Sequence, residues 1–215
     1  MQLKIEKYIT QRNRWPTQGR HILAHFDDTS IVVYQAYSPT IARYAIEHQC
    51  FGGDHFSYRR MSWIKPNFLW MMYRSGWATK EGQEVVLGLR ISRVFFDHLL
   101  CEAVASSFDA ARGHSRSQWE HAIESSDVRL QWDPDHDPHG TKQARRAIQL
   151  GLRGRTLEAF GKRELLDVID MTDFIAAQRQ VLEGALDRLM MPVEQVYQPA
   201  SKAVADNVGL SMSNG

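Results

Sequence analysis

The chain has 215 residues, and its 26 Lys and Arg against 25 Asp and Glu give a formal net charge of +1. Hydrophobic residues make up 43% of the sequence, which contains 9 Phe, 7 Tyr and 6 Trp. These values exclude an intrinsically disordered chain, because disordered chains lack the aromatic side chains that form a core. The length predicts a single α+β domain over residues 1–195, followed by a flexible C-terminal tail over residues 196–215 that is rich in small and polar side chains.

The sequence predicts a cytoplasmic protein that does not enter a membrane. Its longest apolar stretches, residues 68–73 and 94–96, are far shorter than the ~20 residues that a membrane-spanning helix needs. The first residues lack the apolar segment and the small-residue cleavage site of a secretion signal. Cys50 and Cys101 lie far apart and outside any CxxC motif, so we expect two buried thiols in a reducing compartment.

The first half of the chain predicts two units in which a strand precedes a helix. Branched and aromatic residues mark the strands, and Ser38-Pro39 and Ser92 are typical of helix starts. The apolar circumference of residues 67–74 predicts a helix buried on most sides. The predicted elements are strands at 21–26 and 30–37, a helix from Pro39 to near Cys50, an ordered loop or short strand at 54–66, a helix at 67–74, a strand at 84–91 and a helix at 93–106.

The second half of the chain predicts a surface loop followed by further strands and helices. Its predicted elements are a surface loop at 108–117, one or two helical turns at 119–123, a strand at 127–132 that ends at Asp133-Pro134, a helix at 142–157, a strand at 165–171 and a helix from Thr172 to about Leu189. This order favours an α+β fold with a mixed, mainly antiparallel sheet and flanking helices.

Residues 33–39 form the first candidate site. A strand that presents Tyr34, Gln35 and Tyr37 immediately before a capped helix places a phenol, an amide and helix N-terminal N–H groups together. This combination suits a polar planar ring or a phosphate. The alternative is an alternating strand followed by an ordinary helix cap.

Residues 58–66 form the second candidate site. Arg59, Arg60 and Lys65 supply positive charge, while Ser62 and Trp63 supply a hydroxyl and a ring on which a base can stack. These side chains suit an anionic ligand with a planar group, such as a nucleotide. The alternative is a solvated charged loop followed by a core tryptophan.

Residues 131–140 form the third candidate site. Three Asp and two His between residues 133 and 139 suit a divalent metal or an acid/base group. Their spacing matches no known ligand motif, so no residue is assigned to a metal. The alternative is a turn that uses Asp, Pro and Gly for their backbone preferences.

A basic strip follows, with seven Lys or Arg and only Glu158 between Lys142 and Arg163. Such a strip suits phosphate contacts or a solvated helix face. We assign nucleic-acid binding to four of its members: Arg145, Arg146, Arg153 and Arg155.

The chain resembles the domain of unknown function 4291 family in three segments, residues 31–39, 60–80 and 131–135, and the resemblance continues to about residue 195. More distantly, residues 34–39 followed by a helix and Phe51-Gly52 are similar to the opening strand and helix of ADP-ribosyltransferase-like proteins.

The second resemblance implies an ADP-ribosyltransferase-like fold and NAD as the substrate. Gln35 stands where that family has His, Ser62 at its middle motif, and Gln131 or Asp133 at the late strand, where no Glu is present. It implies that Gln35, Gln131 and Asp133 are catalytic. It implies NAD contacts from Tyr34, Ala36, Tyr37, Arg60, Ser62, Trp63 and Lys65.

The expected activity is transfer of ADP-ribose from NAD to a nucleic-acid or protein acceptor, with Asp133 stabilising the positive ribose. The alternative is a non-catalytic nucleotide- or RNA-binding module of the same fold, which uses Arg59, Arg60, Lys65 and the strip from Arg145 to Arg155. A metal-dependent hydrolase built on Asp133 to His139 is the third hypothesis.

Overall fold

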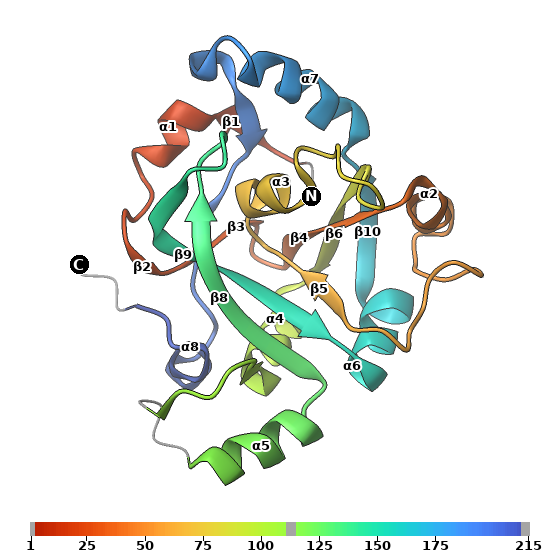
Figure 1. Cartoon of the computed structure of the whole chain (residues 1–215), viewed down its shortest axis with the longest axis vertical. Coiled ribbons are helices and arrows are strands. Elements are labelled where there is room, and N and C mark those ends of the chain that lie inside the picture. The colour runs from red at the N-terminus through yellow and green to blue at the C-terminus, as the bar shows by residue number, and fades with distance from the viewer. Residues whose placement is uncertain (1–2, 111–114, 212–215) are drawn as a thin grey trace.

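Two five-stranded β-sheets form the framework of the protein (Figure 1). The computed structural model describes residues 3–110 and 115–211. The first sheet has the order β10-β6-β4-β3-β12, and every neighbouring pair is antiparallel. Its strands are β3 (Ile22–Phe26), β4 (Ser30–Tyr37), β6 (Val85–Ser92), β10 (Leu165–Asp170) and β12 (Gln195–Tyr197).

The second sheet is mixed. Strands β8 and β9 form a long antiparallel hairpin, which is flanked by the parallel strands β2 and β7, and β5 pairs with β9 in the antiparallel direction. Its strands are β2 (Gly19–Arg20), β5 (Ser62–Ile64), β7 (Val104–Ala105), β8 (Val128–His136) and β9 (Lys142–Leu152). A separate antiparallel pair joins β1 (Ile5–Lys7) to β11 (Met190–Pro192).

Helices surround the sheets, except for α3, which lies between them and contacts both β4 and β8 (Figure 1). The helices are α1 (Tyr8–Arg12), α2 (Pro39–His48), α3 (Phe68–Ser75), α4 (Arg93–Glu102), α5 (Arg116–Ser125), α6 (Gly154–Ala159), α7 (Thr172–Leu182) and α8 (Lys202–Val208). A π-helical turn, Phe160–Glu164, continues α6, and a 3₁₀ turn, Leu186–Arg188, follows α7. None of the described helices is long and apolar enough to cross a membrane.

The α+β class and several local predictions are confirmed. Strands β3 and β4 form the expected hairpin, whose turn is fixed by Asp27 because its Oδ1 accepts hydrogen bonds from the backbone N–H groups of Thr29 and Ser30 at 2.9 and 2.7 Å. Helices α2, α3 and α4 begin as predicted, and α3 is buried on most sides.

The prediction of a helix over residues 142–157 is wrong. Residues 142–152 form β9, which pairs with β8, and only the short helix α6 follows. The buried residues Ala147, Ile148, Leu150, Gly151 and Leu152 have spacing that suits a helix face, but the end of β9 is buried on both faces and shows no simple alternation.

Three predicted ends are also wrong. The helix expected at 93–106 ends at Glu102, and its Cys101 is exposed, not buried. Strand β8 continues through Pro134 to His136, because the pairing with β9 shifts between these two residues and such an irregularity tolerates a proline. Helix α7 ends at Leu182, shortly before Gly184, which favours helix poorly. The loop predicted at 108–117 includes residues 111–114, which lie outside the described residues.

The expected C-terminal tail contains regular structure. The predicted boundary at residue 195 falls inside β12, and α8 packs against α4. The side-chain amide of Asn207 donates to the carbonyl oxygens of Leu100, Cys101 and Ala103 at 2.8, 3.1 and 3.2 Å. Hydrogen bonding and packing therefore hold a segment whose small, polar composition predicts fraying; residues 212–215 lie outside the described residues.

The start of α3 provides a test of the core. Asn67 caps this helix by accepting from Trp70 N, and its amide donates to the buried Glu194 carboxyl at 3.1 Å. We expect Asn67→Ala to lower the free energy of unfolding by ~2–3 kcal/mol, because a cap is lost and a buried acceptor loses its donor. Urea denaturation measures this change. The control, Ser92→Ala, removes the cap of α4 alone and should cost ~1 kcal/mol; equal losses would contradict the role of Glu194.

Candidate functional site

A cleft of about 610 Å³ lies where β4, β5 and the β8–β9 hairpin come together. The backbones of Tyr34 in β4 and Lys65 after β5 join the two sheets through a reciprocal pair of N–H···O bonds of 2.7 and 3.1 Å. The polar side chains that line the cleft include Gln35, Arg60, Ser62, Lys65, Arg74 and Gln131. Two of the candidate sites, residues 33–39 and 58–66, therefore form one site.

A closed ring of hydrogen bonds forms one wall of the cleft. Gln35 Nε2 donates to Ser62 Oγ at 2.7 Å, and Tyr37 Oη donates to Gln35 Oε1 at 3.0 Å. Because the phenol has a single hydrogen, the 2.8 Å contact between Ser62 Oγ and Tyr37 Oη is a bond donated by the serine. The second amide hydrogen of Gln35 goes to the Trp63 carbonyl at 3.1 Å.

This ring satisfies both amide hydrogens of Gln35 and gives its carbonyl oxygen a donor. Gln35 is only 3% exposed, and burial raises the pKa of the Tyr37 phenol far above its ordinary value. Both side chains therefore stay neutral and hold β5 against β4. The geometry therefore gives Gln35 a positioning role.

The ammonium of Lys65 is the least solvated charged group of the cleft. The residue is 5% exposed, its Nζ donates to the Trp63 carbonyl at 3.3 Å, and it forms no ion pair with the described residues. Burial, reinforced by the positive charge of Arg74 and opposed by Asp133, lowers the pKa of Lys65 to about 7. A substantial fraction of this amine is therefore neutral near neutral pH.

The rest of the lining is cationic and rich in amides. Arg60 and Arg74 are exposed, and neither forms an ion pair with the described residues. No carboxylate is among the described residues that line the cleft. Asp133 is half-buried and is not among the lining residues; its two carboxylate oxygens accept from Gln131 Nε2 at 2.9 Å and from Gln149 Nε2 at 2.7 Å.

Most of the predicted site residues meet at this cleft. Those that line it are Gln35, Ala36, Tyr37, Arg60, Ser62, Trp63, Lys65 and Gln131. Tyr34 does not, because its side chain is fully buried and packs edge-on against Phe68 at 5.5 Å between ring centroids. Asp133 does not line the cleft either, but it accepts hydrogen bonds from Gln131 and Gln149, which do.

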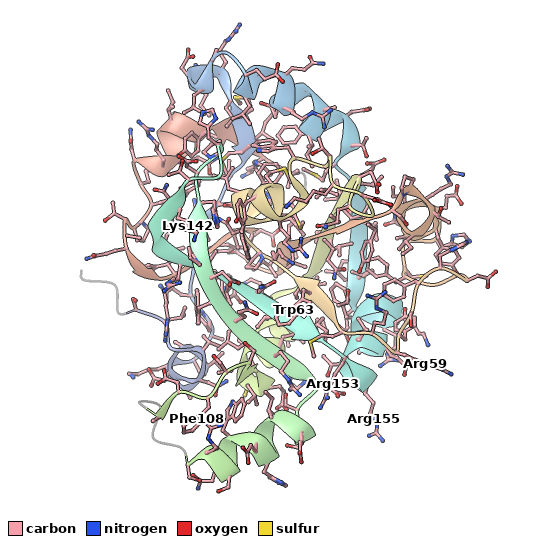
Figure 2. All side chains as sticks on the ribbon, in the orientation of Figure 1. Arg59, Trp63, Phe108, Lys142, Arg153 and Arg155 are labelled. Carbon is pink, nitrogen blue, oxygen red and sulfur yellow. The ribbon has the colours of Figure 1, made fainter. Side chains whose placement is uncertain are left out.

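The basic strip is divided. Figure 2 shows Lys142 at one end of β9 and Arg153 and Arg155 near the other. Arg145 is buried in an ion pair with Asp135, with 2.6 Å between Nη2 and Oδ2.

The other members of the strip differ in their contacts. Arg153 donates to the carbonyl oxygens of Ser126 at 3.2 Å and Glu124 at 2.6 Å, which holds α5. Arg146 and Arg155 are exposed. The four arginines assigned to nucleic-acid binding therefore do not form one surface.

The acidic segment at the end of β8 and in the following turn is occupied by structural contacts. Asp137 accepts from the backbone of His139 and Thr141, and Asp135 is paired with Arg145. His136 is buried and stacks on the ring of Tyr73, with 3.5 Å between ring centroids, and its ring is nearly parallel to that of Trp70 at 5.3 Å. Across the described residues, no group of three His, Cys, Asp or Glu side chains is placed to hold a metal ion.

Two of the cleft residues that were not predicted as site residues are important for its chemistry. Arg74 ends α3, within a segment assigned entirely to the core. Gln149 lies directly opposite Gln131 in the β8–β9 pairing, and the expectation of a helix over residues 142–157 concealed this cross-strand pair. A strand assignment for residues 142–152 would have revealed it.

The fold and the cleft define an α+β protein with a cationic, amide-rich site between two β-sheets. The chain belongs to the family described as Domain of unknown function (DUF4291), whose model matches residues 21–197. This range includes every residue named above as lining the cleft. No match to a curated protein was found.

The Gln35 ring predicts a stability difference between two glutamines of the same cleft. Gln35→Leu should lower the free energy of unfolding by ~2–3 kcal/mol, because the Trp63 carbonyl, Ser62 and Tyr37 each lose one of their hydrogen bonds in a largely buried place. Gln83 also lines the cleft but makes no side-chain hydrogen bond within the described residues, so Gln83→Leu should change it by less than ~0.5 kcal/mol. Similar values for the two variants in chemical denaturation would contradict the proposed bracing of the sheets.

The lowered pKa of Lys65 predicts how stability depends on pH. Between the folded value of about 7 and the ordinary value of 10.5, the unfolded chain binds a proton that the folded chain does not. The free energy of unfolding should therefore rise with pH across this window, by as much as ~1.4 kcal/mol per pH unit from this group.

Lys65→Met should remove that slope, whereas the exposed Lys80→Met should retain it. Denaturation curves of both variants and the unchanged protein at several pH values between about 7 and 10 make the comparison. Equal slopes in all three proteins would show that Lys65 keeps an ordinary pKa.

Proposed function

We propose that the cleft binds a nucleotide, with its phosphate at the positive charges and its base against the aromatic and amide wall. The observation that carries the proposal is the charge of the lining: Arg60, Arg74 and Lys65 line the cleft, and no carboxylate does so among the described residues. The two guanidinium groups are without ion-pair partners in the described chain, so they are free to make paired hydrogen bonds with phosphate oxygens.

Other residues of the lining suit the planar part of the ligand. Tyr37, Phe56 and Trp63 contribute aromatic surface, and the amides of Gln131 and Gln149 reach the same space. Asp133 fixes one amide hydrogen of each glutamine, and no hydrogen bond within the described residues uses their carbonyl oxygens. Each amide therefore presents an acceptor and a second donor, which match the polar edge of a base.

ADP-ribose transfer from NAD is the second candidate. The convergence of Gln35, Ser62 and Gln131 on one cleft favours it, because the resemblance to ADP-ribosyltransferase-like proteins implies that the first, middle and late motifs meet. That reaction also needs a carboxylate against the positive ribose. Since Asp133 does not line the cleft and both of its oxygens already accept from Gln131 and Gln149, we place binding without cleavage of NAD first.

Isothermal titration with AMP and with NAD tests the proposal. AMP should bind, with an affinity that falls as salt is raised, and Arg60→Ala or Arg74→Ala should each weaken binding by about tenfold. Arg155→Ala removes an exposed arginine that does not line the cleft and should leave the affinity unchanged. Loss of affinity in the Arg155 variant alone would place the phosphate elsewhere.

Further assays distinguish nucleotide binding from ADP-ribose transfer and from the binding of an RNA end. Incubation with NAD should release no nicotinamide if the cleft only binds, whereas release that is abolished by Asp133→Asn would establish the transferase instead. Binding of short single-stranded RNA in competition with AMP would identify an RNA end as the ligand. RNA binding without competition would contradict a shared site.

A further inference from the structure

Lys65 differs from the other described lysines in its surroundings. Lys162 and Lys202 are exposed and paired with Glu158 and Asp206, and Lys80 is exposed at the end of α3. Lys65 lines the cleft, is 5% exposed and has one hydrogen-bond partner, a neutral carbonyl. This environment leaves the amine available to react from the cleft side.

The groups around Lys65 favour a neutral amine before reaction and a cation after it. Burial and the nearby Arg74 oppose the protonated form, and an amine that has lost its proton is nucleophilic. Asp133 attracts positive charge on the same nitrogen, although it does not form an ion pair with it. A product that carries a positive charge on Nζ therefore retains one stabilising partner.

We propose that Lys65 is a nucleophile that forms a Schiff base with an aldehyde on a phosphorylated ligand in the cleft. The inference rests on the proposed phosphate-binding role of Arg60 and Arg74, which would place the aldehyde near Nζ. The ligand class is a phosphorylated aldehyde, such as the open-chain form of a sugar phosphate or of a nucleotide that carries a free sugar.

The reaction balances without an oxidant or a reductant. The lone pair of Lys65 Nζ attacks the carbonyl carbon, and the carbonyl electron pair takes a proton to give a carbinolamine. Loss of the hydroxyl group with a second proton releases one water and leaves a carbon–nitrogen double bond. The net change is amine plus aldehyde to imine plus water, and protonation of the imine gives the cation that Asp133 attracts.

Pyridoxal phosphate is the probe, because it combines an aldehyde, a phosphate and a planar ring. The full-length protein is treated with a limiting amount of the probe, reduced with borohydride and mapped by peptide mass spectrometry. We expect at least about tenfold more label on Lys65 than on Lys80, and protection of Lys65 by AMP.

Two variants control the experiment. Lys65→Met should lose the preferred label, while Lys80→Met should keep it, with circular dichroism confirming that both fold. Equal labelling of all exposed lysines with little at Lys65 would overturn the proposal. If AMP binds as expected but Lys65 is not labelled, the Schiff-base inference alone fails; if Lys65 is labelled but neither AMP nor inorganic phosphate protects it, the nucleotide proposal fails instead.

Discussion

The contact between β4 and the segment from Ser62 to Lys65 is the constraint on which the cleft depends. Through it, an antiparallel sheet and a mixed sheet from distant parts of the chain share one boundary. The backbone bonds between Tyr34 and Lys65 set the spacing, and the ring of Gln35, Ser62 and Tyr37 fills the polar space beside them. Because the three side chains of this ring hydrogen-bond to one another, the sheets can meet around polar groups without a large desolvation cost.

The same contact explains the unusual charge of the site. The backbone pairing of Lys65 places its side chain at this boundary, where it is buried and where the positive charge of Arg74 affects its pKa more than the negative charge of Asp133 does. The acidic residues of β8 and its following turn already have partners: Asp133 accepts from glutamine amides, Asp135 is paired with Arg145, and Asp137 accepts from backbone N–H groups. The near-zero net charge thus conceals a positive cleft next to carboxylates that are already occupied.

The sequence predicted the fold class, the β3–β4 hairpin and the starts of α2 to α4, because turn and cap residues act locally. It also identified residues 33–39 and 58–66 as polar sites, but only the tertiary pairing of Tyr34 with Lys65 shows that they are one. The β8–β9 hairpin was missed, since a strand buried on both faces and a helix face have similar apolar spacing. Because the hairpin was missed, the Gln131–Gln149 pair and the structural role of Arg145 were not predicted either.

A crystal structure of the complex with AMP tests the central claim most directly. We expect the phosphate to lie within hydrogen-bond distance of the Arg60 and Arg74 guanidinium groups, and the base to lie against Trp63 and the amides of Gln131 and Gln149. A phosphate bound elsewhere, such as at Arg155 or in the smaller cavity beside Arg12, would contradict it.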